Sequence, residues 1–152
     1  CKSKAVGNYQ VSILANQEVT AAGYDEAILM DPHGFVCQGA GENIFLVKDG
    51  VLHTPDLGCG ALDGITRQTI FQIATDLGIK IVERRITRDE FYIADEAFLT
   101  GTAAEVTPIR EYDDRPIGIG SRAPITEQLQ RIFFEAVSGK REEYRHWLTP
   151  VA

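Results

Sequence analysis

Lys4 and Tyr9 are the first residues whose types and spacing could support chemistry, because an amine stands five positions before a phenol. A lysine forms a Schiff base with a carbonyl compound only when its amine is deprotonated, which burial and positive neighbours favour. A tyrosine hydroxyl can hydrogen-bond an oxygen on a bound ring. Both residues also have structural alternatives, a solvated surface charge and a buried aromatic ring. Lys2 is a competing amine, but it lacks the downstream Gly7-Asn8-Tyr9.

Residues 62–67, Leu-Asp-Gly-Ile-Thr-Arg, stand at the start of a predicted helix. The free N–H groups of a first helical turn, the helix dipole and the Thr66 hydroxyl make a ready phosphate site. Capping of the helix by Asp63 or Thr66 explains the same residues without a ligand, and both interpretations remain open. Arg67 can assist a phosphate or pair with a surface acid.

Two further segments contain the small residues that let a backbone approach a ligand. Residues 100–104, Thr-Gly-Thr-Ala-Ala, follow a predicted strand, and their successive N–H groups could bind an anion, with Thr102 serving both a phosphate and a carboxylate. A plain turn explains them equally well. Residues 38–43, Gln-Gly-Ala-Gly-Glu-Asn, suggest a bend between strands. They do not predict a dinucleotide fold, because a strand rather than a helix follows.

Three long helices are predicted to position these segments. Apolar spacing indicates helices over residues 9–22, over 66–77, and from Pro124 to just before Gly139. A short helix or docking segment around Trp147 follows. Residues expected to be buried on the second and third helices are Ile70, Phe71, Ile73, Ala74, Leu77, Ile125, Leu129, Ile132, Phe133, Ala136 and Val137.

Strands are predicted in the rest of the chain, and those of its first half are expected to form an antiparallel meander. Asp49-Gly50 is a strong two-residue hairpin signal, and Thr87 with Glu90 has capping-box spacing for a short helical turn. The predicted strands are Glu26–Met30, Phe35–Gln38, Asn43–Lys48, Val51–Thr54, Ile79–Ile86, Ala97–Thr100 and Val106–Tyr112, with a turn at Asp113-Asp114 and a return through Pro116–Ile119. We therefore expect one α+β domain with a mostly antiparallel, barrel-like sheet and flanking helices.

Composition excludes several classes of function. The 152 residues are 44% hydrophobic and 24% charged, as in ordinary globular proteins, and the net charge of −7 argues against a nucleic-acid surface. No apolar run approaches the roughly 20 residues of a membrane helix, so we expect no membrane partner. Cys1, Cys37 and Cys59 lack the spacing of zinc ligands and predict reduced thiols in a cytoplasmic protein, with no metal.

Together, residues 4–9, 39–45, 62–67 and 100–108 resemble the fold type IV pyridoxal-phosphate transaminases, and most closely the branched-chain amino acid aminotransferases. The resemblance covers essentially the whole chain. Its most specific wording is Gly-Ala-Gly-Glu-Asn-Ile-Phe with Gly-Thr-Ala-Ala-Glu-Val-Thr-Pro. The resemblance implies that residues 1–152 are a C-terminal cofactor-binding domain, that an N-terminal domain is absent from this chain, and that the full-length protein is a homodimer or higher homo-oligomer.

Residue roles follow from the resemblance alone. Lys4 would hold pyridoxal 5′-phosphate as a Schiff base and then shuttle protons. Tyr9 would contact the ring oxygen and Leu62 would pack on the ring. The other implied cofactor contacts are Gln38, Gly64, Ile65, Thr66 and Thr102, and the amides of Thr102 and Ala103 would bind the substrate carboxylate.

Gln38 departs from the family pattern. The family places a glutamate beside the pyridine nitrogen, where its charge keeps that nitrogen protonated. A neutral amide can hydrogen-bond the nitrogen but cannot supply an ionic partner, so we expect altered or reduced transamination. A smaller departure is Ala123, where glycine is usual, and we attach no functional meaning to it.

The implied function is transamination of branched-chain amino acids with 2-oxoglutarate. The partners would be small amino acids and 2-oxo acids, and the isolated chain would turn over poorly. A D-amino acid transaminase or an aminodeoxychorismate lyase is the alternative within fold type IV. A degenerate domain that retains the fold without catalysis is the non-enzyme alternative: Gln38 favours it, and the retained Lys4, Tyr9, Thr66 and Thr102 oppose it.

Overall fold

The computed structural model describes residues 4–150, so Cys1 and Lys2 lie outside the described residues. The helices are η1 (Val6–Tyr9), α1 (Gln10–Ala21), η2 (Leu57–Cys59), α2 (Ile65–Asp76), η3 (Arg88–Ile93), α3 (Pro124–Val137) and η4 (Glu142–Trp147), where η marks a 3-10 helix. The strands are β1 (Ile28–Met30), β2 (Val36–Gly39), β3 (Asn43–Lys48), β4 (Val51–Pro55), β5 (Ile81–Arg84), β6 (Glu96–Gly101), β7 (Glu105–Pro108), β8 (Glu111–Tyr112) and β9 (Arg115–Pro116).

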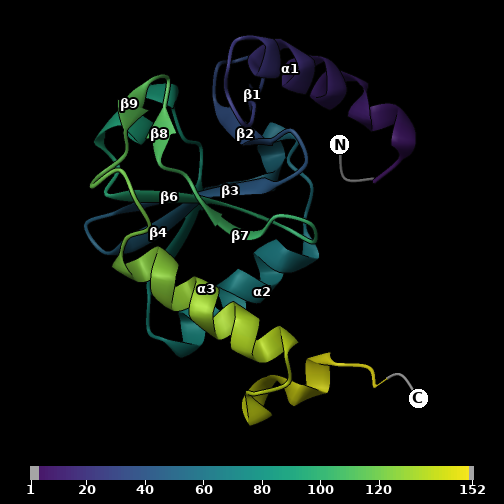
Figure 1. The fold of residues 1–152 in the computed structure, drawn as a ribbon, viewed down its shortest axis with the longest axis vertical. Coiled ribbons are helices and arrows are strands. Elements are labelled where there is room, and N and C mark those ends of the chain that lie inside the picture. Colours follow the sequence, from purple (N-terminus) through teal and green to yellow (C-terminus); the bar gives the residue numbers. More distant parts are fainter. Residues whose placement is uncertain (1–3, 151–152) are drawn as a thin grey trace.

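The main sheet has five strands in the order β5-β4-β3-β6-β7. Its pairs are antiparallel except β4 with β5, which run parallel because α2 crosses between them. Within the described residues, β1-β2 and β8-β9 form separate two-stranded sheets (Figure 1). The α+β class is confirmed, and the mostly antiparallel sheet is confirmed with one parallel pair. The barrel-like shape is wrong, because the main sheet stays open and ends at β5 and β7.

The hairpin between β3 and β4 forms where the sequence predicts it. Asp49 and Gly50 have φ of 50° and 74°, and Lys48 pairs with Val51 across the two-residue turn. Two successive positive φ angles are the signature of a turn whose twist matches that of the flanking strands. This short connection fixes the register of β3, the strand at the centre of the main sheet.

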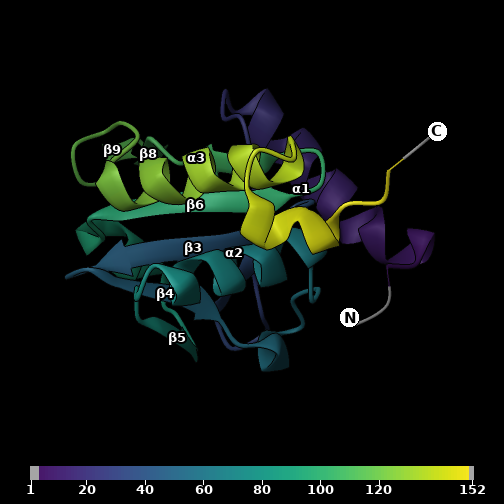
Figure 2. The same ribbon diagram turned by 90° about the horizontal axis from the view of Figure 1, so that it is seen from below.

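Both faces of the main sheet are buried. Phe45 on β3 stacks on Phe98 of β6, with ring centroids 5.0 Å apart, on the face covered by α2 and α3 (Figure 2). Ile44 and Leu46 alternate to the opposite face, where they pack with Phe91 of η3. This alternation is the period-2 geometry of a strand.

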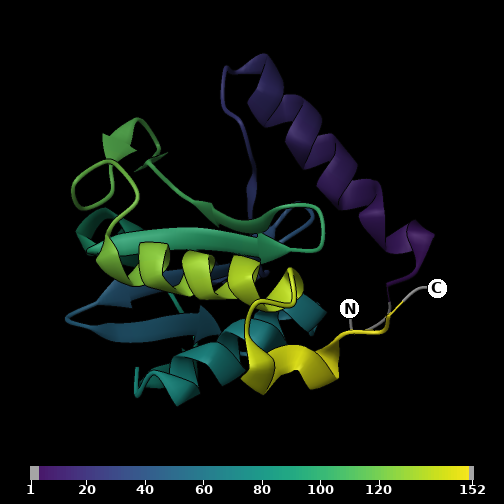
Figure 3. The same cartoon turned by 60° about the horizontal axis from the view of Figure 1, so that its bottom comes forward.

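Helix α1 forms as predicted, but three of its large apolar residues, Val11, Ile13 and Leu14, stay exposed. Val11 and Leu14 are 67% and 66% exposed, and the buried α1 residue is Ser12. Figure 3 shows α1 standing away from the main sheet, on the side opposite α2 and α3. Among residues 4–150, no helix has the length and apolar character needed to cross a membrane.

Two predictions at the C-terminal side need correction. The single strand expected over 106–112 divides into β7 and β8, because β7 pairs with β6 up to Pro108 and the chain then turns to pair with its own return strand β9. Val137 was expected in the core and is 49% exposed, since it lies in the last turn of α3 beside a hollow rather than against the sheet.

The predicted capping box opens η3. The Glu90 carboxylate accepts from the Thr87 N–H at 2.9 Å and from the Arg84 guanidinium at 3.0 Å. The hydrogen bonds from Arg84, the largest cause, and from Thr87 lower the pKa of Glu90 despite its partial burial. Glu90 therefore ties β5 to the segment that covers the second face of the sheet.

Glu90→Gln should lower the free energy of unfolding by about 1 kcal/mol at neutral pH, as expected for loss of a charged cap. Because the pKa of Glu90 is depressed in the folded protein, its contribution is present above the unfolded value of about 4.3 and is lost as the pH falls through the folded value. Urea unfolding at several pH values measures the difference, with Glu142→Gln as an exposed control. A difference that grew in acid would contradict this role.

Candidate active site

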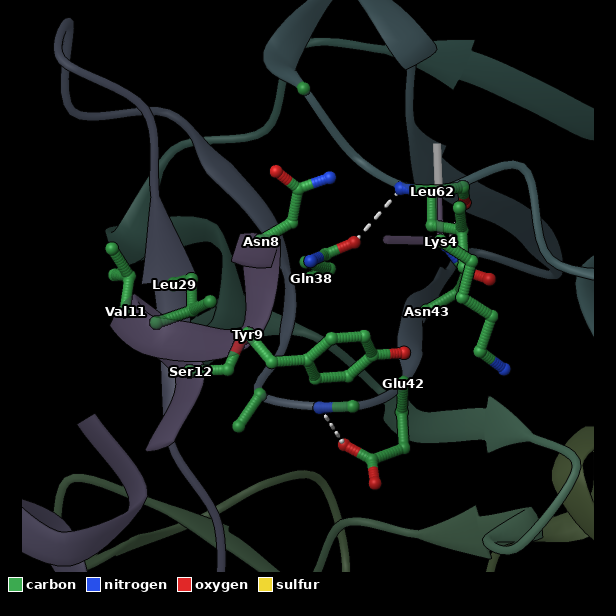
Figure 4. A pocket seen from close by; sticks show the side chains of 13 residues that line it. Lys4, Asn8, Tyr9, Val11, Ser12, Leu29, Gln38, Glu42, Asn43 and Leu62 are labelled. Atoms are coloured by element: carbon green, nitrogen blue, oxygen red, sulfur yellow. Dashed lines mark hydrogen bonds between the residues drawn. The ribbon is translucent and has the colours of Figure 1, made fainter. Parts of the chain in front are cut away.

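A pocket of about 190 Å³ lies between the start of the chain and the loops that flank β2 and α2 (Figure 4). Four of the predicted site residues line it: Lys4, Tyr9, Gln38 and Leu62. Tyr9 ends η1 and is half-buried, whereas Lys4 precedes η1 and is exposed. A short 3-10 turn, rather than a strand or long helix, therefore sets the distance between the amine and the phenol.

Gln38 faces the pocket from β2 in a fixed orientation. Its Oε1 accepts a hydrogen bond from the Leu62 N–H at 2.9 Å (Figure 4). A main-chain N–H can only donate, so the amide oxygen must face Leu62 and the amide NH₂ is left for another acceptor. The pocket wall thus receives a hydrogen-bond donor from Gln38 and no formal charge.

Asn43 binds the second main-chain polar group of Leu62, its carbonyl oxygen. The buried Asn43 side chain donates from Nδ2 to the Leu62 carbonyl oxygen at 2.6 Å. A Cβ atom on Gly64 would collide with Asn43 Oδ1, so a larger residue at Gly64 would displace this contact. Asn43 lies within one of the segments that the sequence singled out, but its role was missed because a side chain that holds a loop has no spacing signature.

The first turn of α2 has no side-chain cap. Gly64 is the N-cap, and the first turn contains no acidic residue. Asp63 does not cap the helix; its Oδ1 instead accepts from Gln68 Nε2. The interpretation of residues 62–67 as simple capping is therefore wrong for Asp63 and for Thr66, and the first N–H groups of the helix, with their partial positive charge, remain available to an anion.

Thr66 and Thr102 meet at a second hollow, of about 850 Å³. Ile65 lines it as well, so the segment from Leu62 to Ile65 borders both hollows. Thr66 is buried at 7% exposure and Ile65 is 83% exposed. Thr100, two residues before Thr102, has a buried hydroxyl with no hydrogen-bond partner among the described residues. A threonine of α2 and one in the turn after β6 thus line the same hollow beside the uncapped helix start.

Ala103 lies apart from the predicted site residues that line the two hollows. It is exposed in the turn between β6 and β7 and lines neither hollow. Among the described residues, no group of three or more histidine, cysteine, aspartate or glutamate side chains could hold a metal ion.

Arg67 points into the protein rather than toward a ligand. Its Nη2 lies 2.6 Å from Glu83 and donates to the Pro55 carbonyl at 3.3 Å, and its guanidinium stacks 4.6 Å from the Phe71 ring centroid. The side chain is 2% exposed. Of the two roles open from the sequence, the structure supports pairing with an acid.

Glu42 is a pocket residue that sequence reasoning did not select. Burial, the largest cause, and the nearby Glu26 raise its pKa, against the lowering effect of the Gly41 N–H that its Oε2 accepts at 3.0 Å. The pocket therefore contains a carboxyl group that is easier to protonate than an exposed glutamate. The sequence offered little to select Glu42, which is one acidic residue after the glycines at 39 and 41.

Comparison with known proteins identifies the same family. The family model described as amino-transferase class IV matches residues 3–112. The branched-chain-amino-acid aminotransferase of Pseudomonas aeruginosa is 57% identical over 99% of this chain and 48% of its own length. The probable branched-chain-amino-acid aminotransferase of Aquifex aeolicus is 50% identical over 97% of this chain and 48% of its own.

Solved structures agree in fold. The branched-chain amino acid aminotransferase of Thermobaculum terrenum in its PLP form is 45% identical, with a TM-score of 0.97, over 99% of this chain and 50% of that one. The branched-chain aminotransferase of Thermoproteus uzoniensis with norvaline is 52% identical, with a TM-score of 0.96, over the same shares. The chain spans about half the length of the relatives it matches.

Arg67→Ala should lower the free energy of unfolding by about 2 kcal/mol, because it removes a buried guanidinium that packs on Phe71 and leaves the Pro55 carbonyl and the half-exposed Glu83 without this partner. Urea denaturation of the cofactor-free protein measures this. Arg131→Ala, which removes an exposed pair with Glu135 on α3, is the matched control and should cost less than about 1 kcal/mol. Unchanged stability together with lost phosphate affinity would instead assign Arg67 to the ligand.

Proposed function

The chain belongs to the class IV aminotransferases, and from this membership we propose that it is the cofactor-bearing part of a pyridoxal-phosphate-dependent branched-chain amino acid aminotransferase. One observation carries the proposal: Lys4, Tyr9, Gln38 and Leu62 line one pocket at the foot of the uncapped helix α2. An amine, a phenol, a hydrogen-bonding amide and an apolar cover are the groups that a charged aromatic aldehyde requires.

The chain's residues fit the phosphate of such a cofactor. The free N–H groups at the start of α2, whose first turn contains no acidic residue, and the hydroxyls of Thr66 and Thr102 offer donors to a phosphate. When bound, pyridoxal phosphate supplies an electron-withdrawing ring through which an amino group passes from an amino acid to a 2-oxo acid. We assign the phosphate to Gly64, Ile65, Thr66 and Thr102.

Lys4 is assigned the covalent and proton-transfer work. Its Nζ would hold the cofactor through the aldehyde carbon, and its free amine would carry the proton of the substrate Cα. The Tyr9 hydroxyl would donate to the ring oxygen, and Leu62 would pack against the ring. The main-chain N–H groups of Thr102 and Ala103 are assigned to the substrate carboxylate, and both residues are exposed.

Gln38 is assigned to the ring nitrogen as a donor. Its oxygen is already bonded to the Leu62 N–H, so its NH₂ group would donate to the ring nitrogen of a bound cofactor and would favour the unprotonated form of that nitrogen. Such a ring withdraws electrons less strongly than a protonated one. We therefore propose slower transamination than in a relative with a carboxylate at this position.

Substrates and assembly of the full-length protein are proposed from its relatives. Neighbouring structures are of branched-chain aminotransferases with norvaline, with 4-methylvaleric acid and with N-(5′-phosphopyridoxyl)-L-glutamate. These ligands support branched-chain amino acids as donors and 2-oxoglutarate as acceptor. We propose a cytoplasmic homodimer or higher homo-oligomer.

A degenerate, non-catalytic domain is the second candidate, and Gln38 is the observation that favours it. A D-amino acid transaminase or aminodeoxychorismate lyase would share the pocket but use different substrates. Turnover of L-leucine, D-alanine and aminodeoxychorismate by the full-length protein separates these possibilities from the main proposal.

Trapping should place the cofactor on Lys4. The full-length protein mixed with pyridoxal phosphate and reduced with borohydride should carry one phosphopyridoxyl group on Lys4 and none on Lys2. Peptide mass spectrometry locates the group, and Lys4→Ala should abolish it. Labelling of Lys2 or of Lys80 instead would remove Lys4 from the proposed role.

Gln38→Glu should make the cofactor ring a stronger electron acceptor and raise kcat by about tenfold, because a carboxylate favours a protonated ring nitrogen. The absorbance of the bound cofactor should shift with the change. Gln38→Leu is the control that removes the hydrogen bond to Leu62 and should weaken cofactor binding. No change in either the spectrum or turnover on Gln38→Glu would contradict the assignment of Gln38 to the ring nitrogen.

A further inference from the structure

Cys37 and Cys59 lie against each other at the back of the candidate active site. Cys37 is on β2 and is buried, and its Sγ donates to the main-chain oxygen of Cys59 at 2.9 Å. Cys59 is the last residue of η2, and 22 positions separate the two along the chain. The fold thus brings the sulfur of one cysteine into contact with the main chain of the other.

The thiol of Cys59 also influences that of Cys37. Burial, the largest cause, raises the pKa of Cys37 to about 12 together with the charge of Cys59, a hydrogen bond with the Cys59 thiol and the charge of Asp31. Cys59 is only half-buried and donates from Sγ to the Asp56 oxygen at 2.9 Å. The Cys59 thiol is therefore partly accessible to solvent, whereas the Cys37 thiol is buried.

We propose that Cys37 and Cys59 form a reversible intramolecular disulfide, and that its formation weakens cofactor binding at the adjacent pocket. The sequence predicted two ordinary reduced thiols, and the structure describes both as free. The sequence spacing gave no reason to pair these two cysteines. The structure does, because the fold brings β2 and η2 together. The oxidant is a peroxide.

Each step of the oxidation balances. The Cys59 thiolate attacks one oxygen of hydrogen peroxide, the O–O bond breaks and hydroxide leaves, so Cys59 becomes a sulfenic acid. The Cys37 sulfur then attacks the Cys59 sulfur, the S–O bond breaks, and the departing hydroxide takes the Cys37 proton as water. The two thiols lose two electrons and two protons, and the peroxide is reduced to two molecules of water.

The pair is joined to the pocket through both chain segments. Cys37 directly precedes Gln38, and Cys59 directly precedes Gly60, and both of these neighbours line the pocket. A disulfide requires each sulfur to turn from its carbonyl partner toward the other, which removes the Sγ hydrogen bond from Cys59 to the Asp56 oxygen and leaves only the main-chain one at 3.3 Å. Displacing η2 moves the segment up to Leu62, whose N–H bonds Gln38.

Peptide mapping tests the disulfide without reference to the proposed function. Trypsin cuts after Lys4, Lys48 and Arg67, so Cys37 falls in peptide 5–48 and Cys59 in peptide 49–67. Full-length protein treated with hydrogen peroxide and alkylated before digestion should yield these two peptides linked, and dithiothreitol should separate them. Cys59→Ser should abolish the linked species, and Cys1→Ser should leave it unchanged. The proposal is overturned if both thiols remain alkylated or are found only as sulfinic acids.

The effect on the pocket rests on the proposed function and is measured separately. Oxidised wild type should bind pyridoxal phosphate about fivefold more weakly than reduced wild type, the loss expected for one net hydrogen bond. Dithiothreitol should restore the affinity. Cys59→Ser and Cys37→Ser should bind equally before and after peroxide, and either variant suffices if the other folds poorly. A linked peptide with unchanged affinity would overturn the coupling, whereas absence of cofactor binding in the reduced protein would overturn the proposed function alone.

Discussion

Two side-chain hydrogen bonds to Leu62 hold the candidate site together. Gln38 receives the Leu62 N–H, and Asn43 donates to its carbonyl oxygen. Because Gln38 is on β2 and Asn43 begins β3, these bonds tie the entry to α2 to two strands at once. Main-chain groups in a loop must find partners somewhere, and here strand side chains supply them. The start of α2 is thereby fixed without a capping side chain, and its N–H groups stay available.

The main sheet makes this arrangement rigid. β3 carries Asn43 at its first position and buries side chains on both faces along the rest of its length. A one-residue slip would exchange the two faces, so the short turn at Asp49-Gly50 and the stack of Phe45 on Phe98 both fix where Asn43 points. A strand packed on both sides cannot shift to suit a ligand, and the adaptable parts are left to the loops and η1.

Local signals predicted most of the elements and few of their long-range contacts. The hairpin at Asp49-Gly50, the capping box at Thr87 and the extent of α3 depend on neighbouring residues, so the sequence sufficed. The exposure of Val11 and the inward direction of Arg67 depend on which elements pack against each other. Apolar spacing within one helix does not predict that packing. Lys4, Tyr9, Gln38 and Leu62 were selected through a family resemblance, and the structure brings them to one pocket. Residues that act by holding others, such as Asn43, leave no pattern of their own.

Position 38 separates the demands of the fold from those of chemistry. The fold needs one oxygen here to accept the Leu62 N–H, and an amide or a carboxylate supplies it equally well. The pocket meets only the second terminal atom of the side chain, which is a donating NH₂ in glutamine and a charged oxygen in glutamate. Changing this residue can therefore reverse the polarity offered to a ring nitrogen while the loop before α2 keeps its anchor. The scaffold tolerates the departure because the two functions of the side chain use different atoms.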